Sequence, residues 1–447
     1  MNANHPGAAW TPPEKIHFIG AGGAGMAPLA GIVLELGCRV SGSDLLDNGK
    51  CRALRAQGCA IATGHRAENL PGDAQAVVYS SAVAPDNPEL LAARSHALPA
   101  WRRGEFLSLL ARRFRRPVAV AGAHGKTSVT ALLSWILRRN AVPAGFMIGG
   151  ELCGDFANHA AGDGDIFVTE ADESDGTFAL LSGELAVIPN IDDDHAWDEA
   201  ARRKLEEQFF HFAAAFRQVL YYDAPVARRI LGALPRAGAI APATVETLGL
   251  PARFVGFERA NAALAVQAVL RLGVSIGDAV EALRDFPGVA RRMTEHARSS
   301  DGRWIVVEDY AHHPAELEAS LTALRLRYPG RRLLVIFQPH RYQRLTRYFE
   351  RFAALLAERT DQVWLPPVFA AWSESGSCDS AALAARINAL GGRALAVAAD
   401  YPALAAAVKL AADASPEPAV AAVIGAGDVN AVLPFLVKKP EKNPAGD

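Results

Sequence analysis

A glycine–lysine–threonine motif is the clearest sign of chemistry in the sequence. Residues 121–128 read AGAHGKTS; they end the short apolar run at 117–122 and precede a helical pattern over 129–138. At such a strand-to-helix turn, backbone N–H groups and the helix dipole hold phosphates, a lysine reaches the β- and γ-phosphates, and a hydroxyl binds Mg²⁺. The motif is not a strict Walker A sequence, because Val120 stands where its first glycine would be. It nevertheless predicts a nucleotide phosphate site formed by Gly122, His124, Gly125, Lys126, Thr127 and Ser128.

Two polar segments farther along the chain also follow apolar strands. Residues 166–169 lead into EADESD at 170–175, and residues 185–189 lead into NIDDDH at 190–195. Carboxylates at the carboxyl edge of a strand, beside a phosphate loop, stand where a magnesium ligand is expected. Alternatively, the acidic run is a solvated loop, and a single histidine such as His195 is more often structural than a ligand.

A second glycine-rich turn lies near the start of the chain. Residues 20–25 (GAGGAG) satisfy the GxGxxG pattern between the apolar run 15–20 and a helical pattern over 26–36. Glycines at this point let the backbone approach a diphosphate on the helix N-terminus, and Asp44, after the next strand, stands where such sites place a ribose-binding carboxylate. The pattern fits an NAD site, another diphosphate site, or a turn needed only for packing.

These motifs require a scaffold in which strands alternate with helices. Apolar runs at 15–20, 117–122, 304–309 and 332–337 recur among helical patterns, which predicts an α/β fold with largely parallel sheets. A length of 447 residues suggests about three domains. We expect them at 1–113, 114–286 and 287–437, followed by a charged, proline-containing and disordered tail at 438–447.

Composition excludes several classes of protein. The 46 basic and 48 acidic residues argue against nucleic-acid binding driven by bulk charge. The five cysteines form no CxxC pair, so neither a disulfide scaffold nor a zinc knuckle is indicated. The first residues lack the apolar core of a secretory signal, and prolines, glycines and polar residues break the apolar stretch 418–437 into a strand, a turn and a short helix. We expect a soluble, cytoplasmic protein that does not insert into membranes.

Taken together, the motifs resemble the Mur ligase family, the ATP-dependent amide-forming enzymes of bacterial peptidoglycan assembly. The matching segments occur in family order over nearly the whole chain, and they are FIGAGGAGMAPLA with SGSD, VYSSAVAPDNPEL, AGAHGKTSVT, EADESD, NIDDDH, GVARRM, DYAHHP, FQPHRY and GAGDV. The resemblance implies a Rossmann-like domain for a UDP-sugar, a central P-loop domain for ATP, and a Rossmann-like C-terminal domain. It also implies substrates, UDP-N-acetylmuramate and L-alanine, which are joined through an acyl phosphate with ATP as the cofactor and Mg²⁺ or Mn²⁺ as the metal.

The resemblance also assigns roles to individual residues. The catalytic positions are Lys126, Glu170, His195 and Arg292, of which Glu170 and His195 bind metal together with Thr127. Nucleotide contacts beyond the phosphate loop come from Asn261 to adenine, Arg292 to phosphate and Asp309 to ribose. The UDP-sugar positions are Gly20, Gly22, Gly23, Gly25, Ser43, Asp44, Ser80 and Ser81. The amino-acid positions are Tyr310, His312, His340 and Arg341, where the planar arginine suits an α-carboxylate.

Some positions depart from the family pattern. Ala123 replaces a threonine, while Phe257 and Glu258 replace a histidine and an asparagine before Asn261. A carboxylate near ATP phosphates is unfavourable unless a metal or an arginine offsets it. The stretch between 222 and 261 is short, which implies a shortened central domain, and Trp197 is interposed after NIDDDH.

The alternatives that remain are a family ligase for a preformed peptide, a nucleotide-binding member with reduced catalysis, and an NAD-dependent oxidoreductase. The oxidoreductase hypothesis leaves the GKT and EADESD motifs without a role. The sequence leaves the choice between a monomer and a homodimer open.

Overall fold

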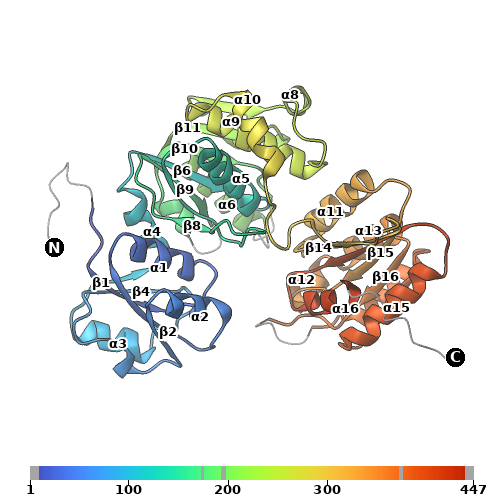
Figure 1. The fold of residues 1–447 in the computed structure, drawn as a ribbon, viewed down its shortest axis with the longest axis horizontal. Coiled ribbons are helices and arrows are strands. Elements are labelled where there is room, and N and C mark those ends of the chain that lie inside the picture. The colour runs from blue at the N-terminus through green and yellow to red at the C-terminus, as the bar shows by residue number, and fades with distance from the viewer. Residues whose placement is uncertain (1–9, 173–175, 193–197, 372–375, 438–447) are drawn as a thin grey trace. The chain divides into compact units, whose positions relative to one another are not determined.

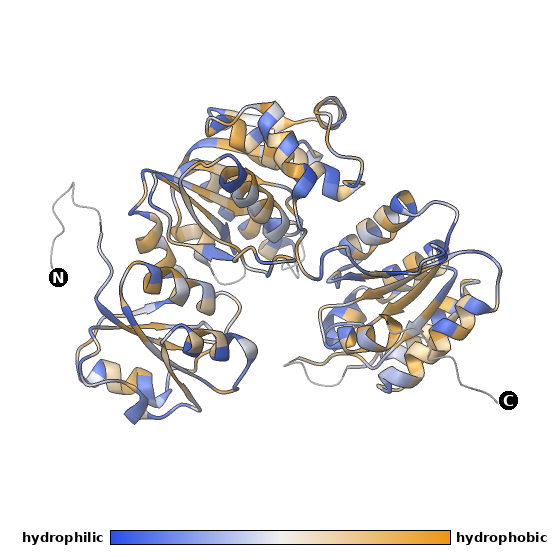
Figure 2. Ribbon diagram, viewed as in Figure 1, coloured by the Kyte–Doolittle hydropathy of each residue, from blue (hydrophilic) through white to orange (hydrophobic). Residues whose placement is uncertain are grey.

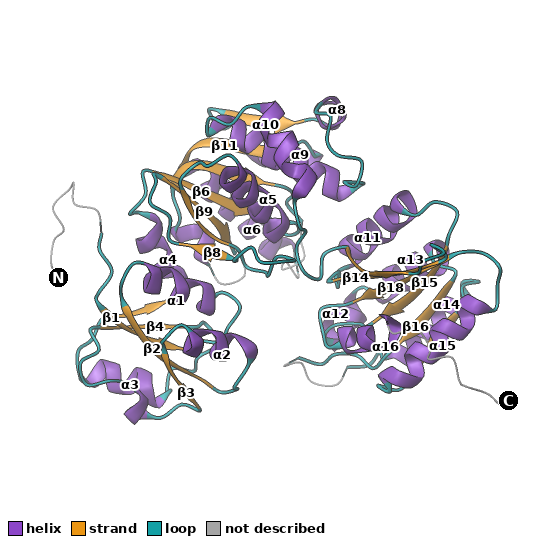
Figure 3. Ribbon diagram, viewed as in Figure 1, coloured by secondary structure: helices purple, strands orange, loops and turns teal. Residues whose placement is uncertain are grey.

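The computed structural model describes residues 10–172, 176–192, 198–371 and 376–437, which form three β-sheets flanked by helices (Figure 1, Figure 3). One sheet lies in each of the three segments expected from the sequence, so the predicted α/β fold class is confirmed. The chain divides into two compact units. The first comprises Met1–Pro251 and Arg259–Pro287 and holds two sheets, and the second comprises Ala252–Glu258 and Gly288–Asp447 and holds the third.

The first sheet has five parallel strands in the order β3-β2-β1-β4-β5. They are β1 (Lys15–Ile19), β2 (Arg39–Asp44), β3 (Ala60–Thr63), β4 (Ala76–Tyr79) and β5 (Ala100–Arg102). The accompanying helices are α1 (Met26–Glu35), α2 (Gly49–Ala56), the 3-10 turn η1 (Ala67–Asn69), α3 (Pro88–Ser95) and α4 (Arg103–Ala111). The strand order reverses between β1 and β4, and open α/β sheets bind ligands outside the carboxyl ends of the strands at such a switch point.

The second sheet has seven strands in the order β12-β11-β10-β6-β9-β7-β8, all parallel to their neighbours except β8. They are β6 (Arg116–Ala121), β7 (Ala144–Met147), β8 (His159–Ala160), β9 (Ile166–Ala171), β10 (Gly183–Ile188), β11 (Phe216–Tyr222) and β12 (Ala237–Ile240). Its helical elements are α5 (Lys126–Arg139), η2 (Thr177–Leu180), α6 (Glu199–Ala214), α7 (Pro225–Leu231), α8 (Pro242–Thr247), α9 (Phe257–Arg271), α10 (Ile276–Ala282) and η3 (Leu283–Asp285). Because β6 lies between β9 and β10, the loops after these three strands meet at one edge.

The third sheet has six strands in the order β13-β14-β18-β15-β16-β17, with only β13 antiparallel to its neighbour. They are β13 (Thr294–Arg298), β14 (Trp304–Asp309), β15 (Arg332–Phe337), β16 (Gln362–Leu365), β17 (Ala394–Ala396) and β18 (Ala419–Ile424). Its helices are α11 (Pro314–Arg327), α12 (Tyr342–Arg347), α13 (Phe349–Arg359), α14 (Ser380–Ala389), α15 (Tyr401–Asp413), η4 (Val429–Val432) and α16 (Leu433–Val437).

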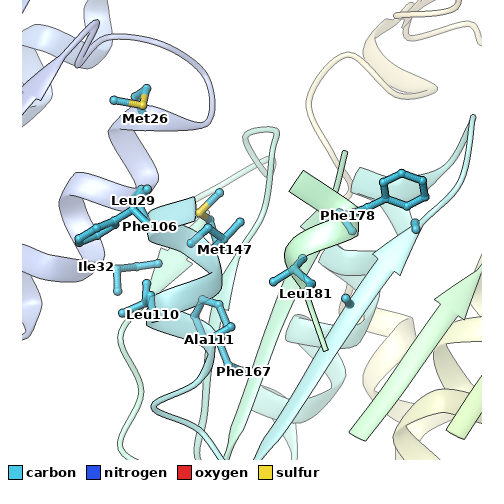
Figure 4. Packing of buried hydrophobic residues seen from close by; sticks show 14 of the residues in the cluster. Met26, Leu29, Ile32, Phe106, Leu110, Ala111, Met147, Phe167, Phe178 and Leu181 are labelled. Atoms are coloured by element: carbon cyan, nitrogen blue, oxygen red, sulfur yellow. The ribbon is translucent and has the colours of Figure 1, made fainter. Parts of the chain in front are cut away.

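Apolar side chains hold the first two sheets together in one continuous core. Figure 4 shows Leu29 and Ile32 of α1 beside Phe106 and Leu110 of α4, with Met147 of the second sheet next to them. The hydroxyl of Ser108 in α4 also donates to the carbonyl of Leu180, 2.7 Å away. The helix that begins at the first glycine-rich turn is therefore packed against the body that carries the GKT motif.

The central strands owe their burial to helices on both faces of each sheet. β6 and β18 are buried along almost their whole length, which matches sequences that are apolar throughout except for Arg116 at the start of β6. Figure 2 shows apolar strands inside and hydrophilic outer faces on the surrounding helices. The stretch 418–437 forms β18, η4 and α16, as predicted. Among the described residues, no helix combines the length and the apolar character needed to cross a membrane.

Candidate functional site

The first glycine-rich turn is tightly packed against the segment after β2. Gly20 has φ +79°, and the N–H of Gly22 donates to Oδ2 of Asp44 at 2.9 Å. A Cβ on Gly22 would lie 2.5 Å from Nδ2 of Asn48 and 2.6 Å from Sγ of Cys51. Glycine is therefore required at position 22 for steric reasons. The structure brings Asp44 to the turn, as expected, with its carboxylate on a backbone amide.

The remaining predicted UDP-sugar positions lie at the same edge of the first sheet. A Cβ on Gly20 would lie 3.2 Å from Cβ of Ser80, which places the loops after β1 and β4 side by side. Ser80 is half-buried and Ser81 is exposed. A Cβ on Gly25 would lie 2.8 Å from Nη1 of Arg103. The guanidinium of Arg103 thus lies near the start of α1, and Arg103 was not among the predicted site residues. Because Arg103 directly follows β5, at the carboxyl edge of the sheet, its place in the sequence could have indicated it.

Ser43 has a supporting position rather than an exposed one. Its side chain is fully buried, and its hydroxyl donates to Oε2 of Glu89 at 2.6 Å. Its carbonyl accepts hydrogen bonds from the N–H groups of Gly20 and Ala21. The hydroxyl of Ser43, one of the predicted UDP-sugar positions, is thus engaged inside the domain, and the residue anchors the turn through its backbone.

Glu89 is the centre of a buried polar network beneath this turn. Nε2 of His17 lies 2.9 Å from its carboxylate, and Asn69 Nδ2 donates to it at 2.7 Å. Burial alone would raise the pKa of Glu89, but the hydrogen bonds from His17, Ser43 and Asn69 outweigh it and lower the pKa to about 2. The network therefore contains a carboxylate with no exposed surface whose lowered pKa keeps it ionised at neutral pH.

The GKT motif forms the loop between β6 and α5, at the centre of the second sheet. Gly125 has φ +81°, and a Cβ on it would lie 3.0 Å from Oδ1 of Asn261 in α9. The structure thus brings the predicted adenine-binding residue against the phosphate loop. α5 begins at Lys126, so Lys126, Thr127 and Ser128 form its first turn. The unsatisfied N–H groups of a first helical turn favour bound anions.

Asn190, which follows the neighbouring strand β10, holds the phosphate loop through two hydrogen bonds. Its Oδ1 accepts from the N–H of His124, and its Nδ2 donates to the His124 carbonyl, both at 2.8 Å. Nε2 of His124 lies 3.5 Å from Oδ2 of Asp192. Asn190 was not among the predicted site residues, although its place at the end of β10, next to β6, could have identified it.

Oxygen atoms suited to a metal gather beside the loop. The hydroxyl of Thr127 donates to Oε2 of Glu170 at 3.1 Å, and the N–H of Gly149 donates to Oε1 at 2.6 Å. Nζ of Lys126 donates to the carbonyl of Gly122 at 2.6 Å. A hydroxyl and a carboxylate are hard donors that fit Mg²⁺ completed by phosphate oxygens. His195, the third predicted ligand, lies outside the described residues.

In the second unit, a turn before β13 presents two adjacent arginines with different surroundings. Nε of Arg291 donates to Oε1 of Glu308 at 3.0 Å, and its Nη2 donates to the carbonyls of Gly425 and Gly427. Both guanidinium groups lie over the ring of Tyr310, at 4.8 Å for Arg291 and 4.9 Å for Arg292, and that of Arg292 also lies 3.8 Å from Oε1 of Glu316. Arg291 is thus held by Glu308 and by two backbone carbonyls, and the contact of Arg292 with phosphate stays a prediction.

Asp309 at the end of β14 is buried beneath the same turn. Its oxygens accept from the N–H groups of Met293 and Ala311 and from the hydroxyl of Ser320, at 2.7–3.0 Å. Burial raises its pKa, although the charge of Arg292 and these hydrogen bonds act in the opposite direction. In this structure Asp309 organises the turn, and its contact with ribose stays a prediction.

Three of the four predicted amino-acid positions form one aromatic row at the carboxyl edge of the third sheet. The ring centres of Tyr310 and His312, and those of His312 and His340, are 5.5 Å apart, and His340 stacks on Phe369 at 5.4 Å. Arg341 has φ +65° and donates its N–H to the Phe369 carbonyl, which fixes the backbone at the end of this row.

The pKa of each histidine in this row is lowered, which favours the neutral ring. Burial lowers the pKa of His312, and burial with the nearby His312, Arg344 and Arg341 lowers the pKa of His340 to about 3. Nη1 of Arg344 lies 3.4 Å from Nδ1 of His340. Sequence reasoning missed this buried arginine, although it lies one helical turn after His340.

Glu258 has a different environment from the one suggested by the sequence. It belongs to the short segment Ala252–Glu258 that is part of the second unit, where its carboxylate forms an ion pair with Arg327. Burial raises the pKa of Glu258 to about 7, against the effect of the Arg327 guanidinium. The arginine that would offset this charge is therefore present within the same unit.

Comparisons with known proteins are in keeping with this arrangement. The family model described as "Mur ligase family, catalytic domain" matches residues 15–115, and "Mur ligase, glutamate ligase domain" matches residues 291–427. The UDP-N-acetylmuramate–L-alanine ligase of Xanthomonas oryzae pv. oryzae is 38% identical over 421 residues, which cover 84% of this chain and 86% of that protein. The enzyme of the same name from Polaromonas naphthalenivorans is 37% identical over 395 residues, covering 80% and 82%.

A solved structure extends the similarity to the fold. UDP-N-acetylmuramate–alanine ligase from Thermotoga maritima matches with a TM-score of 0.76 and 25% identity, covering 95% of this chain and 98% of that chain. A murein peptide ligase from Psychrobacter arcticus shares the fold with a TM-score of 0.65 at 20% identity, covering 96% and 100%. The likeness therefore spans all three sheets, and the chain belongs to the Mur ligase family.

Proposed function

We propose that this chain is an ATP-dependent ligase that joins L-alanine to the lactyl carboxylate of UDP-N-acetylmuramate. The observation that carries the choice of substrates is the 38% identity, over 84% of the chain, to an enzyme named for this reaction. The geometry of the phosphate loop independently supports phosphoryl transfer from a nucleotide. NAD chemistry gives no role to Lys126 or Glu170.

The first step transfers the γ-phosphoryl group of ATP to the lactyl carboxylate. A carboxylate oxygen forms a bond to the γ-phosphorus while the bond from that phosphorus to the bridging oxygen breaks, and ADP leaves with the electron pair. Negative charge accumulates between two polyanions, so the main task of the protein is to supply cations and amide dipoles. Lys126 and the N-terminus of α5 do this at the loop, and Arg292 offers a further guanidinium. When bound, Mg²⁺ would be held by Thr127 and Glu170 and would neutralise phosphate charge.

The second step forms the amide. The amine of L-alanine, in its neutral form, attacks the acyl carbon, the carbon–oxygen bond to phosphate breaks, and inorganic phosphate leaves while the nitrogen loses a proton. We propose that Arg341 binds the α-carboxylate of alanine, with Tyr310, His312 and His340 bounding a small pocket. The lowered pKa of both histidines supports this assignment, because neutral rings do not repel the ammonium group of an incoming alanine.

The decisive experiment measures phosphate release from ATP in the presence of UDP-N-acetylmuramate, with and without L-alanine, and identifies the product by mass spectrometry. We expect alanine-dependent phosphate release and a product heavier than the UDP-sugar by one alanyl residue. A parallel reaction contains a tripeptide that begins with L-alanine in place of the amino acid. Turnover with the tripeptide but not with alanine would instead assign the chain to peptide addition, and no turnover with either would overturn the proposed function.

A further inference from the structure

The turn that carries Arg292 is held on both sides by buried contacts. Its neighbours Arg291 and Met293 have φ of +61° and +49°, in the left-handed region that non-glycine residues rarely adopt. Such backbone persists only where the surrounding structure fixes it. On one side, Arg291 donates to Glu308 and to the carbonyls of Gly425 and Gly427.

On the other side, Met293 is held at both of its backbone polar groups. Its N–H donates to Oδ2 of Asp309 at 2.8 Å, and its carbonyl accepts from Nη1 of Arg327 at 3.0 Å. Arg327 is the last residue of α11, and long side chains on a helix extend toward its N-terminus, so this one reaches back to the turn. The same guanidinium donates through Nη2 to the carbonyl of Arg253 and to the carboxylate of Glu258.

Glu258 gives the guanidinium of Arg327 a fixed position. Both side chains are about four-fifths buried, each being 19% exposed, so neither charge is well hydrated. Within the second unit, the guanidinium groups of Arg327 and Arg253 lower the pKa of Glu258, and the carboxylate of Asp309 raises it. Removing one partner from a buried ion pair leaves the other charge poorly compensated. Loss of Glu258 would therefore release Arg327 as well as remove one hydrogen bond.

We infer that Glu258 and Arg327 are positioning residues for Arg292: the buried pair fixes the Met293 carbonyl and thereby the direction in which Arg292 presents its guanidinium. This inference rests on the proposed function, because it assumes that Arg292 acts on phosphate. The pair acts through the backbone of the turn, so its contribution must depend on Arg292.

A double-mutant cycle tests this dependence. Arg327→Met keeps the aliphatic part of the side chain and removes the guanidinium, and Arg292→Lys keeps the charge but removes the planar fork, so that a measurable rate remains. Misplacing a catalytic group by about 1 Å costs about a hundredfold in rate. We expect Arg327→Met to lower kcat by about tenfold or more with little change in the KM for L-alanine. In the Arg292→Lys background the further loss should be less than about threefold.

The matched control is Arg325→Met, which removes another arginine from the last turn of α11. Arg325 pairs with Asp361 and is 42% exposed, so kcat should stay within about twofold of wild type. Hydrogen exchange by mass spectrometry supplies a readout that is independent of activity. Exchange of residues 289–294 should rise in Arg327→Met and in Glu258→Gln, while that of α13 should not.

The outcomes separate this inference from the proposed function. If the wild type shows no alanine-dependent phosphate release, the proposed function fails, whatever the variants do. If the wild type is active and Arg327→Met lowers kcat equally in both backgrounds, or leaves both kcat and exchange of the turn unchanged, the positioning role is refuted. Should Arg327→Met fold poorly, Glu258→Gln takes its place in the same cycle with the same expectations.

Discussion

Replacing Glu89 by glutamine would test how the buried network beneath the first glycine-rich turn supports substrate binding. The carboxylate has a pKa of about 2 in place of the usual 4.5, and one pKa unit corresponds to about 1.4 kcal/mol. By linkage, ionisation of Glu89 thus makes the folded state about 3 kcal/mol more stable at neutral pH than its protonation would. Glutamine keeps the shape but loses the charge, and its NH₂ group would face one of the donors His17, Ser43 or Asn69.

The measurement should resolve the first sheet from the rest of the chain, since a chain with several domains does not unfold in two states. Hydrogen exchange of β1 and β2, followed by mass spectrometry at pH 7, gives the free energy of local opening. We expect Glu89→Gln to lower it by about 3 kcal/mol. The KM for UDP-N-acetylmuramate should rise several-fold with little change in the KM for ATP, because the Ser43 carbonyl holds the turn through Gly20 and Ala21.

The pH dependence has a defined sign. Folding lowers the pKa of Glu89, so its contribution is fully present above pH 4.5 and is lost as pH falls through about 2. The difference between wild type and variant should therefore be constant from pH 6 to 8. Glu68→Gln, at an exposed site in the adjacent turn η1, is the control and should change stability by less than about 0.5 kcal/mol. A loss below about 1 kcal/mol in Glu89→Gln, or an equal loss in the control, would refute the reasoning.

Three further predictions concern the proposed catalytic steps. Lys126→Ala should abolish ATP turnover while the fold is retained, as judged by phosphate release and circular dichroism; a residual rate above about a tenth of wild type would contradict the assignment. Excess chelator should stop the reaction, and added Mg²⁺ or Mn²⁺ should restore it. Glu170→Gln should raise the Mg²⁺ concentration needed for half-maximal rate. Full activity in excess chelator would refute the proposed metal requirement. Arg341→Ala should raise the KM for L-alanine strongly without altering the KM for ATP. The KM of the wild type for L-alanine should show no histidine titration between pH 6 and 8, since the pKa of His340 is about 3. An unchanged KM for L-alanine in Arg341→Ala would mean that the amino-acid site has been misplaced.

Local sequence determined the fold class and the position of each glycine-rich turn. The run before the GKT motif is apolar and short, and the loop is followed at once by a helix that begins at Lys126. Such patterns depend on residues a few positions apart, and in this chain they predicted β1, β6, β14 and β15 within one residue of their observed bounds. The family resemblance rested on the same short segments, and it is confirmed by the comparisons.

The tertiary structure decided which residues far apart in the sequence contact each other. His124 and Asn190 are 66 residues apart and meet because β10 pairs directly with β6. No local pattern distinguishes Arg291 from Arg292; the difference arises because the loop after β18 offers its carbonyls to only one of them.

Burial decided the surroundings of Ser43 and Glu258. The hydroxyl of Ser43 points inward because it donates a hydrogen bond to the buried carboxylate of Glu89, 46 residues away. Glu258 pairs with Arg327, 69 residues away, because both lie in the second unit. The sequence alone specifies which residues stand at the ends of strands, since that depends on local backbone and hydrophobic pattern. Which of those side chains face a ligand and which support it depends on strand order and on the cost of burying a polar group without a partner.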